Sequence, residues 1–399
     1  MTDVGLRTGG VVLAGGFSSR MGRCKALLEI AGSSALDRVV SSMRHADVED
    51  LIVVSGFHHK EIEKEATGCG VRTVFNDRFE EGMLSSVKTG VKALPDDLDA
   101  FFLLPVDIPL VRPATLREMK KSFSSKPGLE TVFPAFLGQR GHPPLIRGDL
   151  IPDILKWEGP MGLRGFLEQH EASSLTLETP DEGTVTEMDT VEEYQELRSL
   201  AIRRDVPTER ECLAFWEILS TPQEVREHSQ VVGEVAVRLA RLVKDTVQVD
   251  PEDLKAAALL HDMARTLHHH ADVAADMLEL WGFAGTADLV RYHMELPEDE
   301  PLLSGRSLLY LADKLTSGSR AADLREKKKL IEEKFSSDPE ALEAALLRLQ
   351  RAEMIAGNFE KVSGKELEAA LTDLDRERGV SYSNPFLASR EIKPPRPRS

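Results

Sequence analysis

The segment LAGGFSSRMGRCK, residues 13–25, directly follows a short apolar run and decides how the first half of the chain folds. Its glycines let the backbone turn tightly, so that backbone N–H groups can point toward phosphate oxygens. Arg20 and Lys25 add positive charge to the same loop. The glycine spacing matches neither the Walker pattern nor the Rossmann fingerprint. From the glycines alone, a plain turn between a strand and a helix remains an alternative to phosphate binding.

Around this loop, apolar runs alternate with stretches of helical spacing. Strands are expected within residues 9–16, 51–56, 71–76, 100–111, 131–136 and 143–148, and helices over residues 35–46 and 83–94. Strands that alternate with helices indicate a doubly wound α/β domain with a mostly parallel sheet. We place this domain at residues 1–200.

The pattern changes near Val206, and residues 207–378 show helical spacing with no convincing strand. We therefore expect an all-α domain there. Thr221 and Glu224 have the spacing of a capping box at the start of one long helix. Asp250, followed by Pro251, is expected to begin the next helix. Residues 379–399 are rich in proline and serine and are predicted to be disordered.

The composition limits the class of protein. The 399 residues include 50 basic and 67 acidic side chains, a formal charge of −17, which disfavours a general nucleic-acid binder but not an anionic small substrate. No apolar run approaches the ~18 residues of a membrane-spanning helix, and no signal peptide is evident. The three cysteines are widely scattered, so we expect no disulfide framework and a cytoplasmic location.

The glycine loop resembles the MobA-like nucleotidyltransferases, and especially their molybdenum cofactor cytidylyltransferase branch. Every fixed position of that family's pattern, L-A-G-G-x-S-x-R-M-G-x-x-K, is met. Later segments resemble further family elements in the same order, with Leu163 departing from the usual small residue and Glu187 as the first acid of the last element. These segments are Asn76 with residues 82–87, residues 105–109, Gly141-His142-Pro143, Gly162-Leu163-Arg164 and Met188-Asp189-Thr190.

The resemblance implies a nucleotide-diphospho-sugar transferase-like fold and transfer of a nucleotide, CMP from CTP, to a phosphorylated acceptor such as molybdopterin cofactor, with release of pyrophosphate. A molybdoenzyme or an insertion chaperone is an implied partner. Lys25, Arg20 and Asp107 would be catalytic, and Asp107 and Asp189 would hold Mg²⁺. The implied nucleotide-binding residues are Leu13, Ala14, Gly15, Gly16, Ser18, Lys25, Asn76, Gly82, Ser85 and Ser86.

Three of these residues have structural alternatives. Asp189 has the position of an N-cap before a helix that begins near residue 191. Arg164 could equally be a surface cation, and His142 could serve only the turn in which it lies.

Imidazoles and carboxylates recur on the predicted helices of the second domain. His228, the pair His261-Asp262 and Asp313 resemble the H…HD…D pattern of HD-domain phosphohydrolases, and this donor set suits a divalent metal. His270 and His293 resemble extra ligands of family members that hold two ions, with Mn²⁺ or Fe²⁺ favoured over Mg²⁺. Arg265 stands where many relatives have lysine, which leaves the substrate class open.

Two other hypotheses remain at this point. The transferase domain could use GTP, or transfer a nucleotide to a sugar phosphate, and the HD domain could be a regulatory module that binds metal or nucleotide without turnover. The lysines of residues 327–329 are interpreted as part of a solvated helix face.

Overall fold

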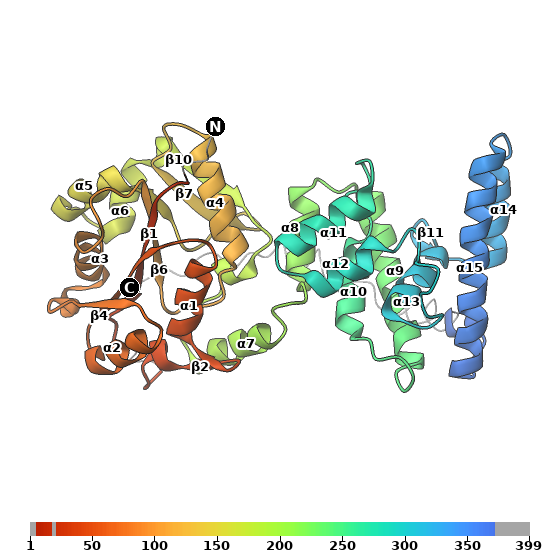
Figure 1. The fold of residues 1–399 in the computed structure, drawn as a ribbon, viewed down its shortest axis with the longest axis horizontal. Coiled ribbons are helices and arrows are strands. Elements are labelled where there is room, and N and C mark those ends of the chain that lie inside the picture. Colours follow the sequence, from red (N-terminus) through yellow and green to blue (C-terminus); the bar gives the residue numbers. More distant parts are fainter. Residues whose placement is uncertain (1–4, 18–20, 372–399) are drawn as a thin grey trace. The chain divides into compact units, whose positions relative to one another are not determined.

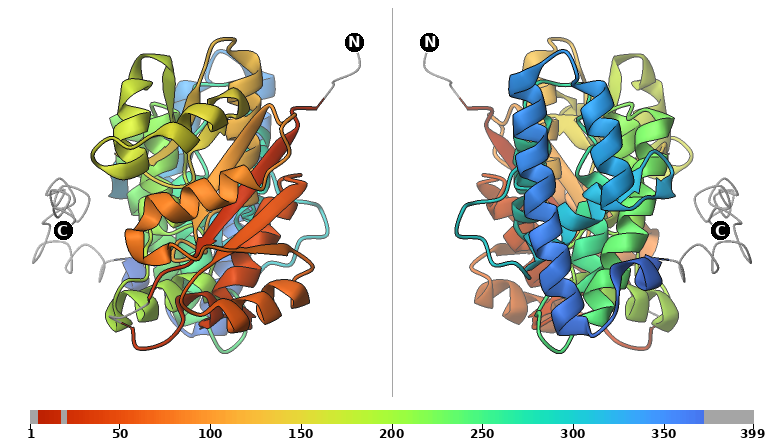
Figure 2. Two further views of the ribbon diagram at one scale, coloured as in Figure 1. Left: turned by 90° about the vertical axis from the view of Figure 1, so that its left-hand side faces the viewer. Right: turned by 90° about the vertical axis from the view of Figure 1, so that its right-hand side faces the viewer.

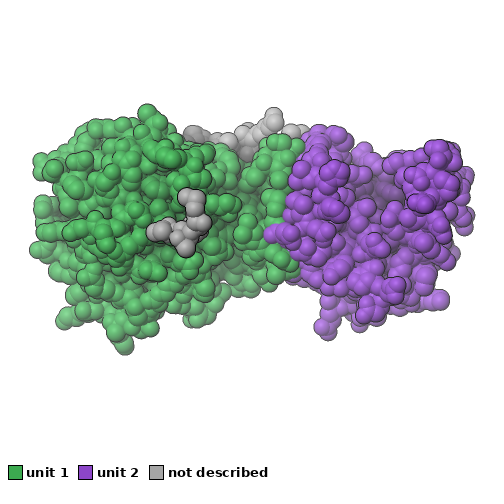
Figure 3. All heavy atoms as spheres, turned by 45° about the horizontal axis from the view of Figure 1, so that its top comes forward, with its two compact units in different colours: residues 1–220, 277–284 green, residues 221–276, 285–399 purple. Residues whose placement is uncertain are grey.

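The structure, a computed structural model, describes residues 5–17 and 21–371. The predictions for Ser18, Arg20 and residues 379–399 therefore lie outside the described residues. The chain divides into two compact units, residues 1–220 with 277–284 and residues 221–276 with 285–399 (Figure 3). Among the described helices, none is both long enough and apolar enough to cross a membrane.

The first unit is built on a mixed, mostly parallel sheet (Figure 1). Its strand order is β10-β7-β9-β6-β1-β4-β5, with β8 paired to β7, and β6, β1, β4 and β5 run parallel to their neighbours in that series. The strands are β1 (Thr8–Ala14), β4 (Asp50–Ser55), β5 (Arg72–Phe75), β6 (Ala100–Pro105), β7 (Thr131–Phe136), β8 (Gln139–Arg140), β9 (Leu145–Arg147) and β10 (Ser174–Glu178); β2 (Glu29–Ile30) and β3 (Ser33–Ser34) form a separate hairpin.

Helices cover both faces of this sheet (Figure 2). The central strands are apolar at successive positions, so Val12 faces one core and its neighbour Val11 faces the other. The helices of the first core are α1 (Ala35–Arg44), α2 (His59–Gly68), α4 (Pro113–Ser125) and α7 (Val191–Ile202), and those of the second are α3 (Met83–Lys92), α5 (Ile151–Lys156) and α6 (Gly162–Gln169). The predicted doubly wound α/β fold is confirmed.

The second unit is helical. Its helices are α9 (Gln223–Leu242), α10 (Pro251–Leu260), α11 (His270–Leu280, of which residues 277–280 group with the first unit), α12 (Ala284–Arg291), α13 (Gly305–Lys314), α14 (Leu324–Lys334) and α15 (Pro339–Ser363). Helices α9, α10 and α13 pack on one another, and α14 and α15 lie side by side (Figure 2). A two-residue hairpin, β11 (Thr316–Ser317) with β12 (Arg320–Ala321), was not predicted.

The predicted capping box at Thr221 is wrong. Helix α9 begins at Gln223 after Pro222, without a side-chain cap. The buried hydroxyl of Thr221 instead donates to the carbonyl of Met263, 3.0 Å away, because that carbonyl packs against the start of α9. Asp250 does cap α10 as expected, by accepting from the backbone N–H of Glu252.

Helix α8 (Glu209–Ile218) lies in the first unit, although its sequence falls within the predicted all-α segment. Glu211 is fully buried and pairs with Arg204 at 2.7 Å and with Arg112 at 3.4 Å. Asp181, also fully buried, pairs with the same two arginines. This network ties α8 to the α/β unit, so the compact unit extends past Pro207 to Ser220.

Candidate active sites

The glycine loop, Asn76 and Asp107 lie at one edge of the sheet. Strands β1, β4, β5 and β6 run parallel, so the segments that follow them emerge on the same side. Gly56, which follows β4, packs tightly on the loop, and a Cβ atom there would lie 2.4 Å from the carbonyl oxygen of Gly15. This close approach explains why the loop after β1 and the loop after β4 both carry glycine.

Lys25 lies between two carboxylates that are far apart in the sequence. Its Nζ is 2.6 Å from Asp189 Oδ1 and 3.2 Å from Asp107 Oδ2, and all three side chains are partly buried. Burial alone would lower the pKa of Lys25, but the charges of Asp107 and Asp189 outweigh burial and raise this pKa. The amine is therefore positively charged at neutral pH.

The N-cap role considered for Asp189 belongs to its neighbour Thr190. Helix α7 is capped by Thr190, which forms a full capping box with Glu193. The side chain of Asp189 thus reaches Lys25 instead of capping the helix. Two convergent carboxylates are the oxygen donors that Mg²⁺ prefers, so Asp107 and Asp189 fit a magnesium site.

The second predicted nucleotide-binding segment, Asn76 with residues 82–87, packs against the glycine loop. Asn76 is buried, and its amide donates to the hydroxyls of Ser85 (2.8 Å) and Ser86 (2.9 Å). Ser86 Oγ lies 3.1 Å from where a Cβ on Gly15 would be. Gly82, with φ of 98°, starts α3 in a conformation that side-chain-bearing residues rarely adopt.

Two other predicted residues make contacts that do not require a ligand. Arg164 is 81% exposed and pairs with Glu168 at 2.9 Å, which favours a surface cation. His142 follows Gly141 in a turn, and its backbone N–H donates to the carbonyl of Thr184. A cavity of about 590 Å³ beside the glycine loop is lined by side chains of both charges, including Arg23, Glu61 and Arg198.

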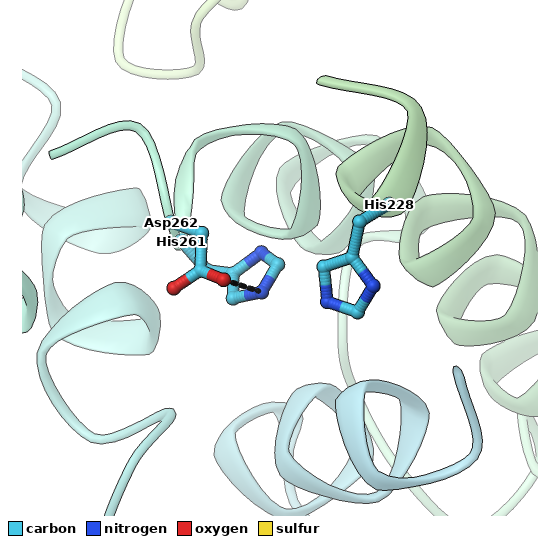
Figure 4. Close-up of side chains that lie close together, drawn as sticks. All are labelled: His228, His261 and Asp262. Carbon is cyan, nitrogen blue, oxygen red and sulfur yellow. Dashed lines mark ion pairs between the residues drawn. The ribbon is translucent and has the colours of Figure 1, made fainter. Parts of the chain in front are cut away.

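In the second unit, the predicted histidines and aspartates converge. His228, His261 and Asp262 form one group whose ligand atoms lie within 4.8 Å of one another, and Asp262, His270 and His293 form another. Figure 4 shows His261 and His228 turned toward the same space, with Asp262 beside them. Asp262 belongs to both groups, so it stands where a ligand shared by two ions would stand.

Asp313 completes the first group from α13. Its Oδ1 lies 3.1 Å from His228 Nε2 and 3.8 Å from His261 Nε2. The four imidazoles stand in a row, with ring centroids 4.9 to 5.5 Å apart between neighbours. All six residues predicted as ligands are therefore brought together.

Backbone carbonyls orient three of the rings. Nδ1 of His228, His261 and His293 contacts the carbonyl oxygens of Gly318, Ala258 and Val290 respectively, at 2.7 to 3.1 Å. A carbonyl can only accept, so Nδ1 carries a proton in each ring, and the neutral form of His261 or His293 presents the lone pair of Nε2 to the cluster. This arrangement is typical of histidines that bind metal. Nε2 of His228 instead contacts Asp313 Oδ1, where it would need to lose its proton to bind a metal ion.

Three buried ring nitrogens bear on whether the converging histidines and aspartates could hold a metal ion. Within residues 5–17 and 21–371, Nε2 of His261, His270 and His293 has no hydrogen-bond partner of good geometry, although Asp262 Oδ1 lies 3.2 Å from His270 and 3.5 Å from His293. Buried polar atoms normally find a partner, and leaving one unsatisfied costs about 1–3 kcal/mol. The cluster suggests divalent metal binding, since an ion would satisfy these nitrogens.

The charge states of Asp262 and His293 agree with this assignment. Burial alone would raise the pKa of Asp262, but His261 and two further imidazoles outweigh burial and hold this pKa far below its usual range. Burial lowers the pKa of His293, so its ring favours the neutral form that binds metal. Burial alone would lower the pKa of His261, but Asp262 and Asp313 outweigh burial and raise this pKa, which favours the charged ring. Arg265 forms an ion pair with Asp262.

Lys327 was missed by the sequence interpretation. Its Nζ donates to the carbonyl of Thr316 at 2.6 Å. The side chain also lines the cavity onto which the six converging histidines and aspartates open, a group of residues that we call the metal cluster. Its neighbours Lys328 and Lys329 are exposed, as predicted. The helical spacing of Lys327 with Ile331, four residues later, was the available signal for a shared face.

Residues 10–174 match the model of the MobA-like NTP transferase domain, and residues 225–318 match that of the HD domain. Molybdenum cofactor cytidylyltransferase of Escherichia coli is 24% identical over 46% of this chain and 92% of its own length. Nicotine blue oxidoreductase of Paenarthrobacter nicotinovorans is 29% identical over 47% of this chain and 95% of its own. Molybdenum cofactor guanylyltransferase of Xanthomonas euvesicatoria is 36% identical over 28% of this chain and 52% of its own.

Other curated relatives are matched over as little as 22% or 26% of their own length. These relatives differ in the activity that their names state, so they do not fix the nucleotide or the acceptor. The chain is therefore similar to a MobA-like NTP transferase domain over residues 10–174 and to an HD domain over residues 225–318, and these two matches indicate an enzyme.

Proposed function

We propose that the chain is a bifunctional enzyme. Its first domain transfers a nucleotide, CMP from CTP, to a phosphorylated acceptor such as molybdopterin cofactor, with release of pyrophosphate. Its second domain is a metal-dependent phosphohydrolase. The transferase proposal rests above all on Lys25, whose charged amine lies between Asp107 and Asp189.

In the transfer, an oxygen of the acceptor phosphate bonds to the α-phosphorus of the nucleoside triphosphate, and the bond to the β-phosphate oxygen breaks. Negative charge then develops on pyrophosphate and on the α-phosphoryl oxygens. Lys25 offsets this charge as a compact cation held in place by two acids. Mg²⁺, which Asp107 and Asp189 would hold, supplies further charge neutralisation when bound.

The hydrolase proposal rests on the three buried Nε2 atoms that lack hydrogen-bond partners in the part of the chain that the structure describes. Imidazole-rich donors favour Mn²⁺ or Fe²⁺ over Mg²⁺. His228, His261, Asp262 and Asp313 would hold one ion, and Asp262, His270 and His293 a second. Such ions supply positive charge at the phosphoryl group and make a water molecule a better nucleophile. His228, His261 and His293 are held with Nε2 toward the cluster by the carbonyls they contact.

The transferase is tested with purified full-length chain, molybdopterin cofactor and each of the four nucleoside triphosphates, following pyrophosphate release. We expect release with CTP only when the acceptor is present. The guanylyltransferase relative favours GTP as the second candidate. No release with any nucleotide and this acceptor would contradict the proposed reaction.

A further inference from the structure

The metal cluster opens into a cavity of about 660 Å³ that lies within the second unit. His228, Asp262, His270 and Asp313 line one part of it. Another part is lined by Lys327 and Ile331 of α14 and by Ala345, Arg348 and Leu349 of α15. The match to the HD domain ends at residue 318, so helices α14 and α15 lie outside the matched segment.

Two cations of helices α14 and α15 are available to a ligand. The Nζ of Lys327 is held by backbone carbonyls, Thr316 O at 2.6 Å and Asp313 O at 3.4 Å. Within the described residues, neither Lys327 nor Arg348 has a carboxylate partner. Two other cations of the cavity are already paired, Arg265 with Asp262 and Lys314 with Asp313.

The same helices supply an apolar surface. Ile331 follows Lys327 by one turn of α14, and Ala345 and Leu349 flank Arg348 on one face of α15. Each helix thus presents one cation to the cavity, with an apolar side chain beside it. A ligand of matching chemistry carries a phosphate at one end and an apolar group at the other.

We propose that the α14–α15 hairpin selects the substrate of the HD site, an organic phosphate monoester. Its phosphoryl oxygens contact Lys327 and Arg348, and its apolar group rests on Ile331, Ala345 and Leu349. This inference rests on the proposed phosphohydrolase function. A monoester is favoured over a diester because its dianion matches two unpaired cations beside the metal cluster.

The reaction is then a balanced hydrolysis. A water oxygen bonds to phosphorus, the bond between phosphorus and the ester oxygen breaks, and the leaving alcohol takes up a proton. Inorganic phosphate is the second product.

Binding of two phosphonates that cannot be hydrolysed tests the inference apart from catalysis. Full-length chain loaded with Mn²⁺ is titrated calorimetrically with phenylphosphonate and with methylphosphonate. We expect phenylphosphonate to bind about tenfold tighter or more, because its ring buries apolar surface. Lys327→Met should weaken both ligands about 10- to 100-fold, the effect of losing a charge-assisted hydrogen bond. Ile331→Ser should lower the ratio of the two affinities at least threefold.

Exposed neighbours on α14 give matched controls. Lys328→Met and Leu330→Ser should leave both affinities unchanged, since neither residue lines the cavity. Equal binding of the two phosphonates, or equal effects of Lys327→Met and Lys328→Met, would overturn the inference even if the chain hydrolyses phosphate esters. The expected binding pattern, with no hydrolysis of p-nitrophenyl phosphate, would support ligand selection by the hairpin and would contradict the phosphohydrolase function that makes this ligand a substrate.

Discussion

Replacing His270 and His293 by alanine together should lower the metal bound by each chain from two ions to one. Two groups of donors share Asp262, and the double substitution removes two of the three donors of one group. It leaves His228, His261 and Asp313 untouched. One remaining carboxylate cannot hold a second ion, whereas the first group keeps all four of its donors.

The assay is elemental analysis of the full-length chain after removal of loosely bound metal, with a thermal melt to verify folding. His268→Ala is the matched control, because His268 is exposed on the same segment and belongs to neither group. Wild-type chain and the control should hold two ions. If the double variant keeps two ions, or if wild-type chain holds one and the double variant keeps it, the two-ion interpretation is refuted.

Three further predictions concern the first unit. Lys25→Ala should lower the rate of pyrophosphate release about 10²- to 10³-fold, as expected for loss of one electrostatic stabiliser, and unchanged activity would exclude the role of Lys25. Glu211→Gln should destabilise the unit by about 3–5 kcal/mol in urea unfolding because it removes one of the two buried carboxylates that offset the charges of Arg112 and Arg204. Glu171→Gln, at an exposed pair, should cost about 1 kcal/mol or less, and similar effects of the two changes would contradict the role of burial. A fragment of residues 1–220 should be more soluble than one of residues 1–206, which lacks α8, and the reverse result would contradict the unit boundary.

The architecture of the first unit could be predicted from the sequence. Central strands of a doubly wound sheet are buried on both faces, so each appears as a short run of apolar residues. Runs such as residues 9–16 and 51–56 form the central strands β1 and β4. That the six histidines and aspartates of the second unit come together could also be predicted, because their order resembles the H…HD…D pattern of HD-domain proteins.

The sequence did not predict which side chains make contacts with distant segments in place of the local contacts that their spacing indicates. Thr221 has the spacing of an N-cap, yet a carbonyl from another helix provides a better buried partner. Lys327 lies in a run of lysines that looks solvated, and only the packing of α14 beside the cavity separates it from Lys328. Helix α8 has helical spacing typical of the second domain, and buried ion pairs with Arg112 and Arg204 assign it to the first.

The central claim is that one chain carries two independent active sites. The most direct test measures both activities, pyrophosphate release and p-nitrophenyl phosphate hydrolysis, in full-length Lys25→Ala and Asp262→Asn variants. We expect Lys25→Ala to lose only nucleotidyl transfer and Asp262→Asn, which removes the carboxylate shared by both metal groups, to lose only hydrolysis. Hydrolysis that survives in Asp262→Asn, or a single variant that abolishes both activities in a folded chain, would contradict the account.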